Sequence, residues 1–352
     1  MEIAVVGPGD IGMALAADLA QRGHAVRLWG TVSDRCEAVR WAGGIRLNDR
    51  GEEATVPVKV PSGAAEAVRG VEAVLVCAPA YRQEVATAAI APHLEDDQAV
   101  VFMPGNLNEP RAMAAFGRAG GRPAVAGVAV PPVAARRSGD NQVVIILRAR
   151  HVPIAGCPAA DRRAVTTFSS LYPVCETERD VLAVFLQNPT YVIHSALTVT
   201  NAGAIEHFYP DPGFDVQAQG TTDATRRVVD ALDSERIALR QRLDYTPPHY
   251  RQATSYYTDE EDGLFGKAAL DVRDLIARYK QPMNLDHRYV KEDLAVNLPT
   301  LRWVASVAGT PVPVVDALVT LGGTLVGRRL DGDGRTADLP TDLADLRSVL
   351  AG

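Results

Sequence analysis

The chain has 352 residues, which exceeds what one hydrophobic core usually supports, so we expect two domains. Hydrophobic residues make up 47% and charged residues 22%, as is ordinary for a globular protein. The formal net charge of -7 argues against nucleic acid or an anionic membrane as the main partner, although a local arginine cluster could still bind an acidic substrate.

The four cysteines, Cys36, Cys77, Cys157 and Cys175, are scattered, with neither C-x-x-C nor metal-ligand spacing. This favours a reduced intracellular protein. The chain enters an apolar run without a basic n-region or cleavage site, so we expect no signal peptide. No apolar run reaches the ~20 residues that span a bilayer. We therefore expect a cytoplasmic protein that binds neither membrane nor nucleic acid.

In the first half of the chain, short apolar runs alternate with helical stretches. The runs are typical of strands buried on both faces of a parallel sheet, and they cover 3–7, 25–29, 71–77, 99–103, 125–130 and 142–147. A helical stretch over 13–20 ends at Gly23. The alternation predicts an α/β fold, a doubly wound Rossmann domain with a mainly parallel sheet, over residues 1–175.

A glycine loop, Gly7-Pro8-Gly9-Asp10-Ile11-Gly12, joins the first strand to the first helix. In this context Gly7 permits a tight turn, Gly9 lets the backbone approach a pyrophosphate, and Gly12 lets helix and strand pack closely. Asp10 and Ile11 open the helix, whose N–H groups and positive dipole end attract phosphates. The loop predicts a dinucleotide site; a plain strand-to-helix turn is the alternative.

The choice between NAD and NADP depends on the end of the second strand. NAD-binding folds place an acidic residue there, but this chain reads Trp29-Gly30-Thr31. Gly30, Thr31, Ser33 and Arg35 could instead accommodate a 2′-phosphate. The sequence therefore favours NADP and leaves NAD open.

Two further positions in this domain are candidates. Asn106 follows the strand at 99–103, where Rossmann domains meet their cofactor, although it could be a plain turn residue. Arg136 and Arg137 could add a contact to a substrate carboxylate or belong to a solvated loop.

Beyond residue 175 the strand signals largely disappear. Helical periodicity covers 181–200, 222–243, 267–279 and 290–307, with proline-rich loops at 210–213 and 247–248. We predict an all-helical domain over 176–330. The tail at 331–352 is rich in Gly, Asp and Pro and then offers one short helix.

Two segments of this helical part carry a family resemblance. The first runs from Asn188-Pro189 through His194 to Asn201-Ala202-Gly203, and the second is Asp286-His287-Arg288-Tyr289-Val290-Lys291-Glu292-Asp293. Together they resemble the octopine/nopaline (opine) dehydrogenase family, whose helical domain carries Asn-Pro…His-Pro…Asn-Ala-Gly and Arg-Tyr-x-x-Glu-Asp. The resemblance includes Pro104-Gly105-Asn106 and Gly309–Ala317, and it extends to about Arg329. Ser195 departs from it, because the family has proline there.

The resemblance implies a helical domain of the 6-phosphogluconate dehydrogenase C-terminal-like type. It also implies a reaction in which a 2-oxo acid condenses with an amine, usually an amino acid, and the imine is reduced by NAD(P)H. The family's histidine falls on His194 as general acid and base, a role that suits an ordinary histidine pKa near ~6.5. The family's aspartate falls on Asp293, which would orient the imidazole.

Arg288 matches the family's arginine and would clamp a substrate carboxylate in a bidentate fork. It lies five positions before Asp293, so we expect it just before that helix begins. Without the resemblance, His194 reads as a core histidine, and Arg288 and Asp293 as an ordinary salt bridge.

Other candidates complete the set. Asn188 and Asn201 flank the histidine and could cap the helix or hold the nicotinamide amide; Asn201 is our second substrate-binding candidate. The aromatic residues that could wall the amine pocket are Tyr256, Tyr257 and Phe265. His207, His249 and His287 show no metal-ligand spacing together, so we assign no metal. A homodimer remains open.

Two other functions remain open. Glycerol-3-phosphate and ketopantoate reductases share the two-domain architecture, but they use a lysine on the helical domain as proton donor. Lys267, Lys280 and Lys291 lack the lysine-asparagine context of those enzymes. The other alternative is a non-catalytic NAD(P) sensor, in which the histidine and aspartate would be idle.

Overall fold

The computed structural model describes residues 1–251, 264 and 283–352. It divides into two compact units: Met1–Phe185 with Leu350–Gly352, here the sheet unit, and Leu186–Val349, here the helical unit. The predicted boundary at 175 therefore lies ten residues before the end of the sheet unit's main segment, and most of the predicted tail belongs to the helical unit. The predicted helix at 267–279 lies outside the described residues, as do Tyr256, Tyr257 and Phe265.

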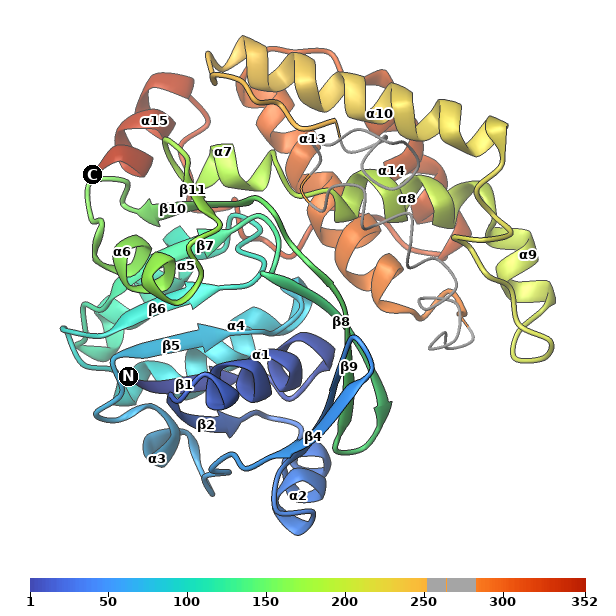
Figure 1. Cartoon of the computed structure of the whole chain (residues 1–352). Helices are drawn as coiled ribbons and strands as arrows, with labels where there is room; N and C mark the ends of the chain where they lie inside the picture. Colours follow the sequence, from blue (N-terminus) through green and yellow to red (C-terminus); the bar gives the residue numbers. More distant parts are fainter. Residues whose placement is uncertain (252–263, 265–282) are drawn as a thin grey trace. The chain divides into compact units, whose positions relative to one another are not determined.

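The sheet unit alternates strands and helices along the chain (Figure 1). Its elements are β1 Glu2–Val6, α1 Asp10–Gln21, β2 Ala25–Trp29, α2 Ser33–Trp41, β3 Ile45–Asp49, β4 Glu52–Val56, α3 Ala64–Val68, β5 Ala73–Val76, α4 Ala80–Ile90, the 3-10 helix η1 Ala91–His93, β6 Ala99–Phe102, α5 Glu109–Ala119, β7 Ala124–Val128, β8 Val133–Gly139, β9 Gln142–Arg148, β10 Val152–Cys157, α6 Arg163–Leu171, β11 Cys175–Thr177 and α7 Val181–Phe185.

A seven-stranded sheet in the order β11-β10-β7-β6-β5-β1-β2 forms the centre of this unit. Neighbouring strands from β7 to β2 pair in parallel, and β10 pairs antiparallel with β7. Strands β5, β6 and β7 are buried along their whole length, as their continuous apolar sequences predict. The predicted α/β class and the strands at 3–7, 25–29, 71–77, 99–103 and 125–130 are confirmed.

The run at 142–147 forms a strand, but not in the predicted sheet. It is β9, which belongs to a second, four-stranded sheet in the order β4-β3-β9-β8. Strand β9 pairs antiparallel with β8, whose alternating buried and partly exposed residues suit a hairpin with one solvated side. The β3–β4 hairpin was not predicted. Its turn residues Arg50 and Gly51 both have positive φ, as a two-residue type I′ turn requires.

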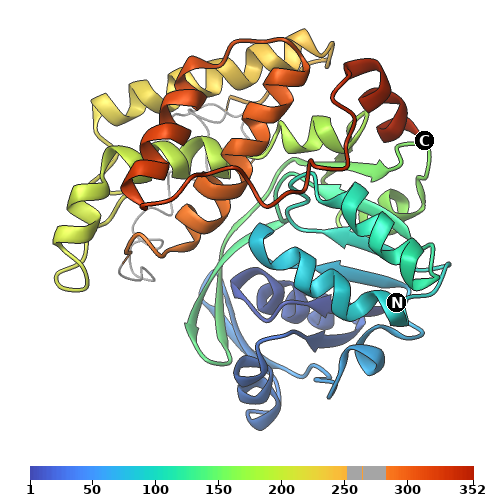
Figure 2. The same cartoon turned by 180° about the vertical axis from the view of Figure 1, so that it is seen from behind.

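Helices cover both faces of the seven-stranded sheet. Helix α1 lies on the face seen in Figure 1, and α4 and α5 lie on the face seen in Figure 2. Helix α1 also contacts β8 and β9, so the second sheet packs against the helix that follows the glycine loop. This helix is buried over most of its length, from Gly12 to Leu19.

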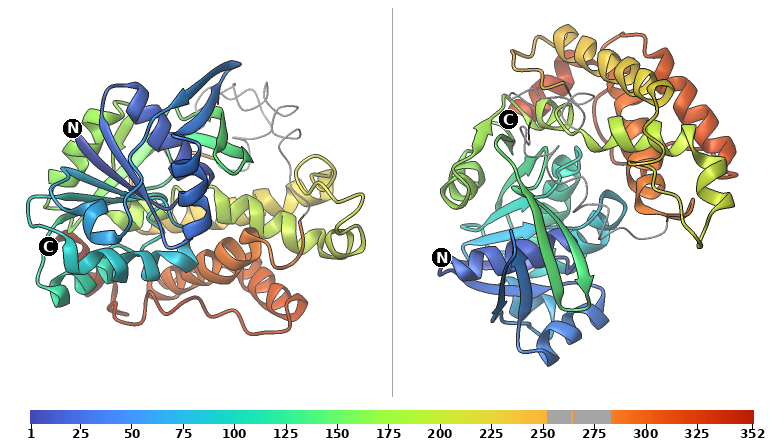
Figure 3. Two further views of the ribbon diagram at one scale, coloured as in Figure 1. Left: turned by 90° about the horizontal axis from the view of Figure 1, so that it is seen from below. Right: turned by 45° about the vertical axis from the view of Figure 1, so that its right-hand side comes forward.

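The helical unit contains α8 Thr190–Thr200, α9 Ala202–His207, α10 Asp223–Arg242, the π-helix η2 Tyr289–Asn297, α13 Leu298–Val307 and α14 Pro313–Leu325, and α15 Leu343–Ala351 begins in it. Helix α8 packs against α10, η2 and α14 (Figures 1 and 3). Every α8 residue from Tyr191 to Val199 is buried, so α8 is the central helix of this unit. Every described helix of the chain is too short or too polar to cross a membrane.

Two predicted helices are interrupted, each near a proline. The stretch 181–200 divides into α7 and α8, because Pro189 begins the second helix and the side chain of Asn188 accepts the backbone N–H of Thr190 at 2.9 Å. The stretch 290–307 is a π-helix up to Asn297 and an α-helix afterwards. Pro299, the second residue of this α-helix, has no N–H to donate to a preceding turn, so it cannot continue the hydrogen-bond ladder of the π-helix.

Candidate active site

The glycine loop has the geometry of a phosphate site. A Cβ on Gly12 would lie 1.9 Å from the carbonyl oxygen of Gly7, so only glycine allows α1 to start this close to β1. A Cβ on Gly9 would meet no atom within 4 Å, which leaves open space beside the first turn of α1. Asp10 and Ile11, the first two residues of α1, are partly exposed. The residues present therefore fit the pyrophosphate of a dinucleotide.

Beneath the loop, Cys77 packs against the glycines. A Cβ on Gly7 would lie 2.8 Å from the Cys77 carbonyl oxygen. Burial raises the pKa of the Cys77 thiol to about 12, so it stays protonated and serves packing. The other three cysteines are free too.

The end of β2 is pressed against the same loop. A Cβ on Gly30 would lie 2.2 Å from Cδ of Pro8, which explains glycine at this position. Thr31 follows it and is exposed. Nothing acidic stands at Trp29-Gly30-Thr31, so the end of this strand offers no carboxylate to a ribose hydroxyl.

Arg35, which follows this strand end, experiences the positive charge of Arg137. Partial burial, and next the positive charge of Arg137, lower the pKa of Arg35, while Asp10 opposes the effect. Arg137 comes from β8, and its Nε lies 3.1 Å from Oδ1 of Asp10 in the glycine loop. From the sequence, Arg137 is a candidate substrate contact or part of a solvated loop, because nothing in the sequence predicts that β8 packs on α1.

Asn106 lies where the sequence predicts, after β6 in the sheet unit. It is 2% exposed and has a φ of 57°, a left-handed conformation that asparagine tolerates better than most residues. Both the turn and the cofactor interpretation are compatible with this backbone, and its cofactor contact stays a prediction.

In the helical unit, His194 of α8 and Asp293 of η2 meet although they are 99 positions apart. His194 Nδ1 lies 2.7 Å from Asp293 Oδ2. The residues are 5% and 1% exposed, so the pair is buried. Asn297 Nδ2 donates to Asp293 Oδ1 at 3.2 Å and holds the carboxylate from its other side. A charge-assisted bond in this setting fixes the tautomer and the ring orientation of the histidine.

The π-helix brings two of its residues, Tyr289 and Asp293, into contact with His194. The backbone N–H of Leu298 donates to the carbonyl of Asp293, five residues earlier, which is the bond that defines this helix. Tyr289 and Asp293, four residues apart, both contact His194: the Tyr289 ring stacks on the imidazole with centroids 3.6 Å apart and planes 13° apart. Helical bulges of this kind are frequent at functional sites.

Arg288 occupies the position immediately before the π-helix, as its spacing from Asp293 predicts. Its side chain is 45% exposed, and Nη1 lies 3.7 Å from Oε2 of Glu292, which is longer than a hydrogen bond. This ion pair links the guanidinium to Glu292, the residue that precedes Asp293 in the π-helix.

The asparagines that flank His194 have structural partners. Asn201 ends α8, and its Nδ2 donates to the carbonyl oxygens of Leu197 at 2.9 Å and Gly220 at 3.2 Å. These bonds tie α8 to the loop before α10. The substrate contact of Asn201 stays a prediction.

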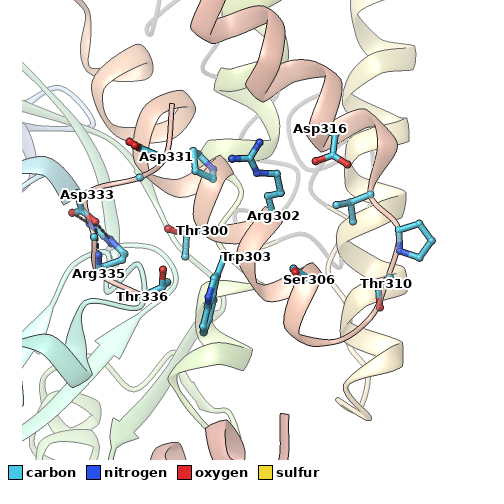
Figure 4. Close-up of a pocket in the computed structure, with 15 residues that line it drawn as sticks. Thr300, Arg302, Trp303, Ser306, Thr310, Asp316, Asp331, Asp333, Arg335 and Thr336 are labelled. Atoms are coloured by element: carbon cyan, nitrogen blue, oxygen red, sulfur yellow. Dashed lines mark hydrogen bonds and ion pairs between the residues drawn. The ribbon is translucent and has the colours of Figure 1, made fainter. Parts of the chain in front are cut away.

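A cavity of about 520 Å³ lies elsewhere in the helical unit, and neither His194 nor Asp293 lines it. It lies between α13, the start of α14 and residues 331–336 (Figure 4). Arg302 and Trp303 of α13 line this cavity, and in Figure 4 Asp316 and Asp331 lie on either side of Arg302. Its charges are mixed, and none of the predicted site residues lines it.

Comparison with known proteins links both units to dehydrogenases. Residues 177–326 match the family described as NAD/NADP octopine/nopaline dehydrogenase, alpha-helical domain, and residues 3–151 match ketopantoate reductase PanE/ApbA. An opine dehydrogenase from Arthrobacter sp. (strain 1C) is 25% identical over 345 residues, which cover 95% of this chain and 93% of that protein.

Two solved structures share the fold. Octopine dehydrogenase with NADH and L-arginine has a TM-score of 0.71 at 18% identity, covering 100% of this chain and 98% of that one. Yersinopine dehydrogenase with NADP+ bound has a TM-score of 0.63 at 16% identity, covering 99% of this chain and 97% of that one. The predicted two-part fold class is confirmed.

Proposed function

We propose that the chain, whose residues 177–326 match the octopine/nopaline dehydrogenase family, catalyses the reductive condensation of a 2-oxo acid with an amine, usually an amino acid. The product is a secondary amine. The nicotinamide cofactor supplies the hydride that reduces the imine formed from the two substrates. The observation that carries the proposal is the buried pair of His194 and Asp293, 2.7 Å apart in the matched helical unit.

His194 is the group that exchanges protons with the substrates. Its Nδ1 faces Asp293, so proton exchange with the reacting nitrogen and oxygen falls to Nε2. Asp293 holds the imidazole in that tautomer and stabilises the imidazolium when it forms, as the aspartate of a catalytic triad does. Asn297 in turn fixes the second oxygen of Asp293.

Arg288 binds the carboxylate of the oxo acid. We expect Arg288→Lys to raise KM for the oxo acid about tenfold or more, because lysine cannot form the two parallel hydrogen bonds of the fork. KM for the amine serves as the internal control and should change little. Steady-state kinetics with each substrate varied in turn will measure both values, and an unchanged KM for the oxo acid would exclude this role.

NADP is the preferred cofactor, with Gly30, Thr31 and Arg35 around the 2′-phosphate and Arg137 as a second cation. The partial burial of Arg35 and the positive charge of Arg137, which both lower the Arg35 pKa, support this, because a bound phosphate would stabilise the charged guanidinium. Removing one charged hydrogen bond is worth about 1.5–3 kcal/mol. Arg35→Ala should therefore lower kcat/KM for NADPH by about 10- to 100-fold and leave the value for NADH nearly unchanged.

Arg46→Ala is the matched control for this cofactor test. It removes an exposed guanidinium of the same unit, eleven positions after Arg35, that already pairs with Glu53 at 2.6 Å. We expect no change in either cofactor's kcat/KM. A wild-type enzyme that oxidises NADH more efficiently than NADPH would refute the preference.

The carbonyl-reductase alternative is less well supported. The ketopantoate reductase match ends at residue 151 and so covers only the sheet unit. In the helical unit, Lys291 Nζ lies 2.7 Å from Asp286 Oδ2 in a salt bridge, while Lys267 and Lys280 lie outside the described residues. The pair of His194 and Asp293 favours imine reduction over a lysine-assisted carbonyl reduction.

A substrate matrix tests the proposed function. Purified enzyme with NADPH is offered 2-oxo acids, each with and without a panel of amines, while cofactor absorbance and product mass are followed. We expect consumption that requires both substrates, and a product of the mass of the secondary amine. Consumption with the oxo acid alone would indicate a carbonyl reductase, and tight cofactor binding without consumption would indicate a sensor. Light scattering of the same sample will show whether the protein forms a homodimer.

A further inference from the structure

Tyr289 makes close contacts with the proposed catalytic groups His194 and Arg288. Its ring covers the face of the His194 imidazole with centroids 3.6 Å apart and an angle of 13° between the planes. Asp293 holds the same imidazole by its edge, through Nδ1. Rotation of the imidazole about the Cβ–Cγ bond of His194 is therefore opposed by the Asp293 carboxylate at Nδ1 and by the Tyr289 ring along its face.

The Tyr289 ring is itself fixed by neighbours. Gln217 Nε2 donates to its hydroxyl oxygen at 3.2 Å, and its backbone N–H donates to His287 Nδ1 at 3.3 Å. The ring of His287 stands at 90° to it with centroids 4.5 Å apart. Tyr289 is 6% exposed, so these contacts hold a buried ring in one orientation.

The same ring also contacts the proposed carboxylate clamp. The guanidinium carbon of Arg288 lies 5.5 Å from the Tyr289 centroid, within the range of a cation–π interaction. One aromatic ring thus touches both the proton-exchanging imidazole and the guanidinium that would hold the oxo acid. Glu292, 3.7 Å from Arg288, is the nearby negative charge on the same helix.

We infer that Tyr289 is a positioning residue that sets the distance between His194 and the carboxylate bound at Arg288. The inference rests on the proposed function, because it gives His194 and Arg288 their roles from that reaction. A reacting centre held by its carboxylate at one end must meet Nε2 at the other, and a displacement of about 1 Å can cost on the order of 100-fold in rate. An ordinary buried tyrosine would contribute stability but would not couple these two groups.

Tyr289→Leu removes the ring, and Tyr289→Phe keeps the ring but loses the hydrogen bond to Gln217. We expect Tyr289→Leu to lower kcat about 10- to 100-fold and to raise KM for the oxo acid, with KM for the amine nearly unchanged. Tyr289→Phe should restore most of the kcat. Tyr245→Leu is the matched control, since Tyr245 is also 6% exposed with an arginine over its ring, and it should affect thermal stability but not the kinetic constants.

A double-mutant cycle with His194→Ala shows whether the ring acts through the histidine. If it does, Tyr289→Leu will lower kcat little further in the His194→Ala background. An equal loss in both backgrounds, or a Tyr289→Leu enzyme with wild-type kcat, would overturn the inference. If His194→Ala itself keeps full activity, the proton-exchanging role proposed for His194 fails instead, and with it the premise of the inference.

Histidine NMR tests the contact independently of turnover. The resonance missing from His194→Ala identifies this ring in the wild-type spectrum. We expect its carbon-bound protons to be shifted upfield by the stacked tyrosine, to remain so in Tyr289→Phe and to move toward ordinary values in Tyr289→Leu. An unshifted wild-type resonance would refute the stacked arrangement whatever the enzyme's substrates are.

Discussion

His194→Ala is expected to lower kcat by about 10²–10⁴-fold, the usual contribution of a positioned general acid–base group. The alanine variant keeps the cofactor loop and Arg288, so binding of both substrates should persist while proton exchange is lost. Asp293→Asn should produce a loss of similar size. The neutral amide lacks the negative charge that stabilises an imidazolium, and it can present its NH2 group in place of an acceptor to Nδ1, which lies 2.7 Å from the carboxylate oxygen.

Both losses should appear in kcat more than in KM, because the pair acts mainly in the transition state. The double variant should be hardly slower than either single variant, since residues that act as one unit are not additive. His207→Ala is the matched control: this histidine lies at the end of α9 in the same unit and should leave kcat unchanged. Near wild-type kcat/KM in both His194→Ala and Asp293→Asn would refute the pair.

Arg236→Ala is expected to destabilise the helical unit by about 3–5 kcal/mol, the usual cost of breaking a buried ion pair. Arg236 of α10 is 0% exposed, and its Nε donates to Asp233 at 2.7 Å. The other nitrogens donate to the carbonyl oxygens of Leu186 at 2.6 Å, His249 at 3.2 Å and Tyr250 at 2.7 Å. One guanidinium therefore joins α10 to the segment that leads into α8 and to the loop after α10.

Urea unfolding followed by circular dichroism will measure this loss. Arg242→Ala is the matched control, because Arg242 ends the same helix but is exposed, and its loss should stay within about 0.5 kcal/mol. A change below about 1 kcal/mol for Arg236→Ala would contradict the role of this arginine as a buried connector.

The central strands were predictable because they are buried on both faces. Continuous apolar runs such as 73–76 and 99–102, in a chain that alternates them with helical stretches, indicate strands of a parallel sheet. The β3–β4 hairpin was missed because its strands are short and largely polar. The run at 142–147 was assigned to the wrong sheet, since an apolar run indicates burial and not the neighbouring strand.

The site was predictable only in part. His194 and Asp293 are 99 positions apart, so no local spacing relates them, and their pairing was inferred from a family resemblance. The π-helix could not be predicted, because the change of hydrogen bonding near Pro299 depends on packing as well as on the proline. The contact between Tyr289 and His194 depends on that helix. Arg137 reaches Asp10 only because β8 packs against α1.

One measurement tests the proposed reaction most directly. NADPH deuterated at its transferable hydrogen is incubated with the enzyme, a 2-oxo acid and an amine, and the products are analysed by mass spectrometry. We expect a secondary amine that carries one deuterium on the carbon that was the ketone carbonyl, and none of it with His194→Ala at the same enzyme concentration. Deuterium found in the corresponding 2-hydroxy acid, with no labelled amine, would contradict the assignment of this chain as an imine-reducing dehydrogenase.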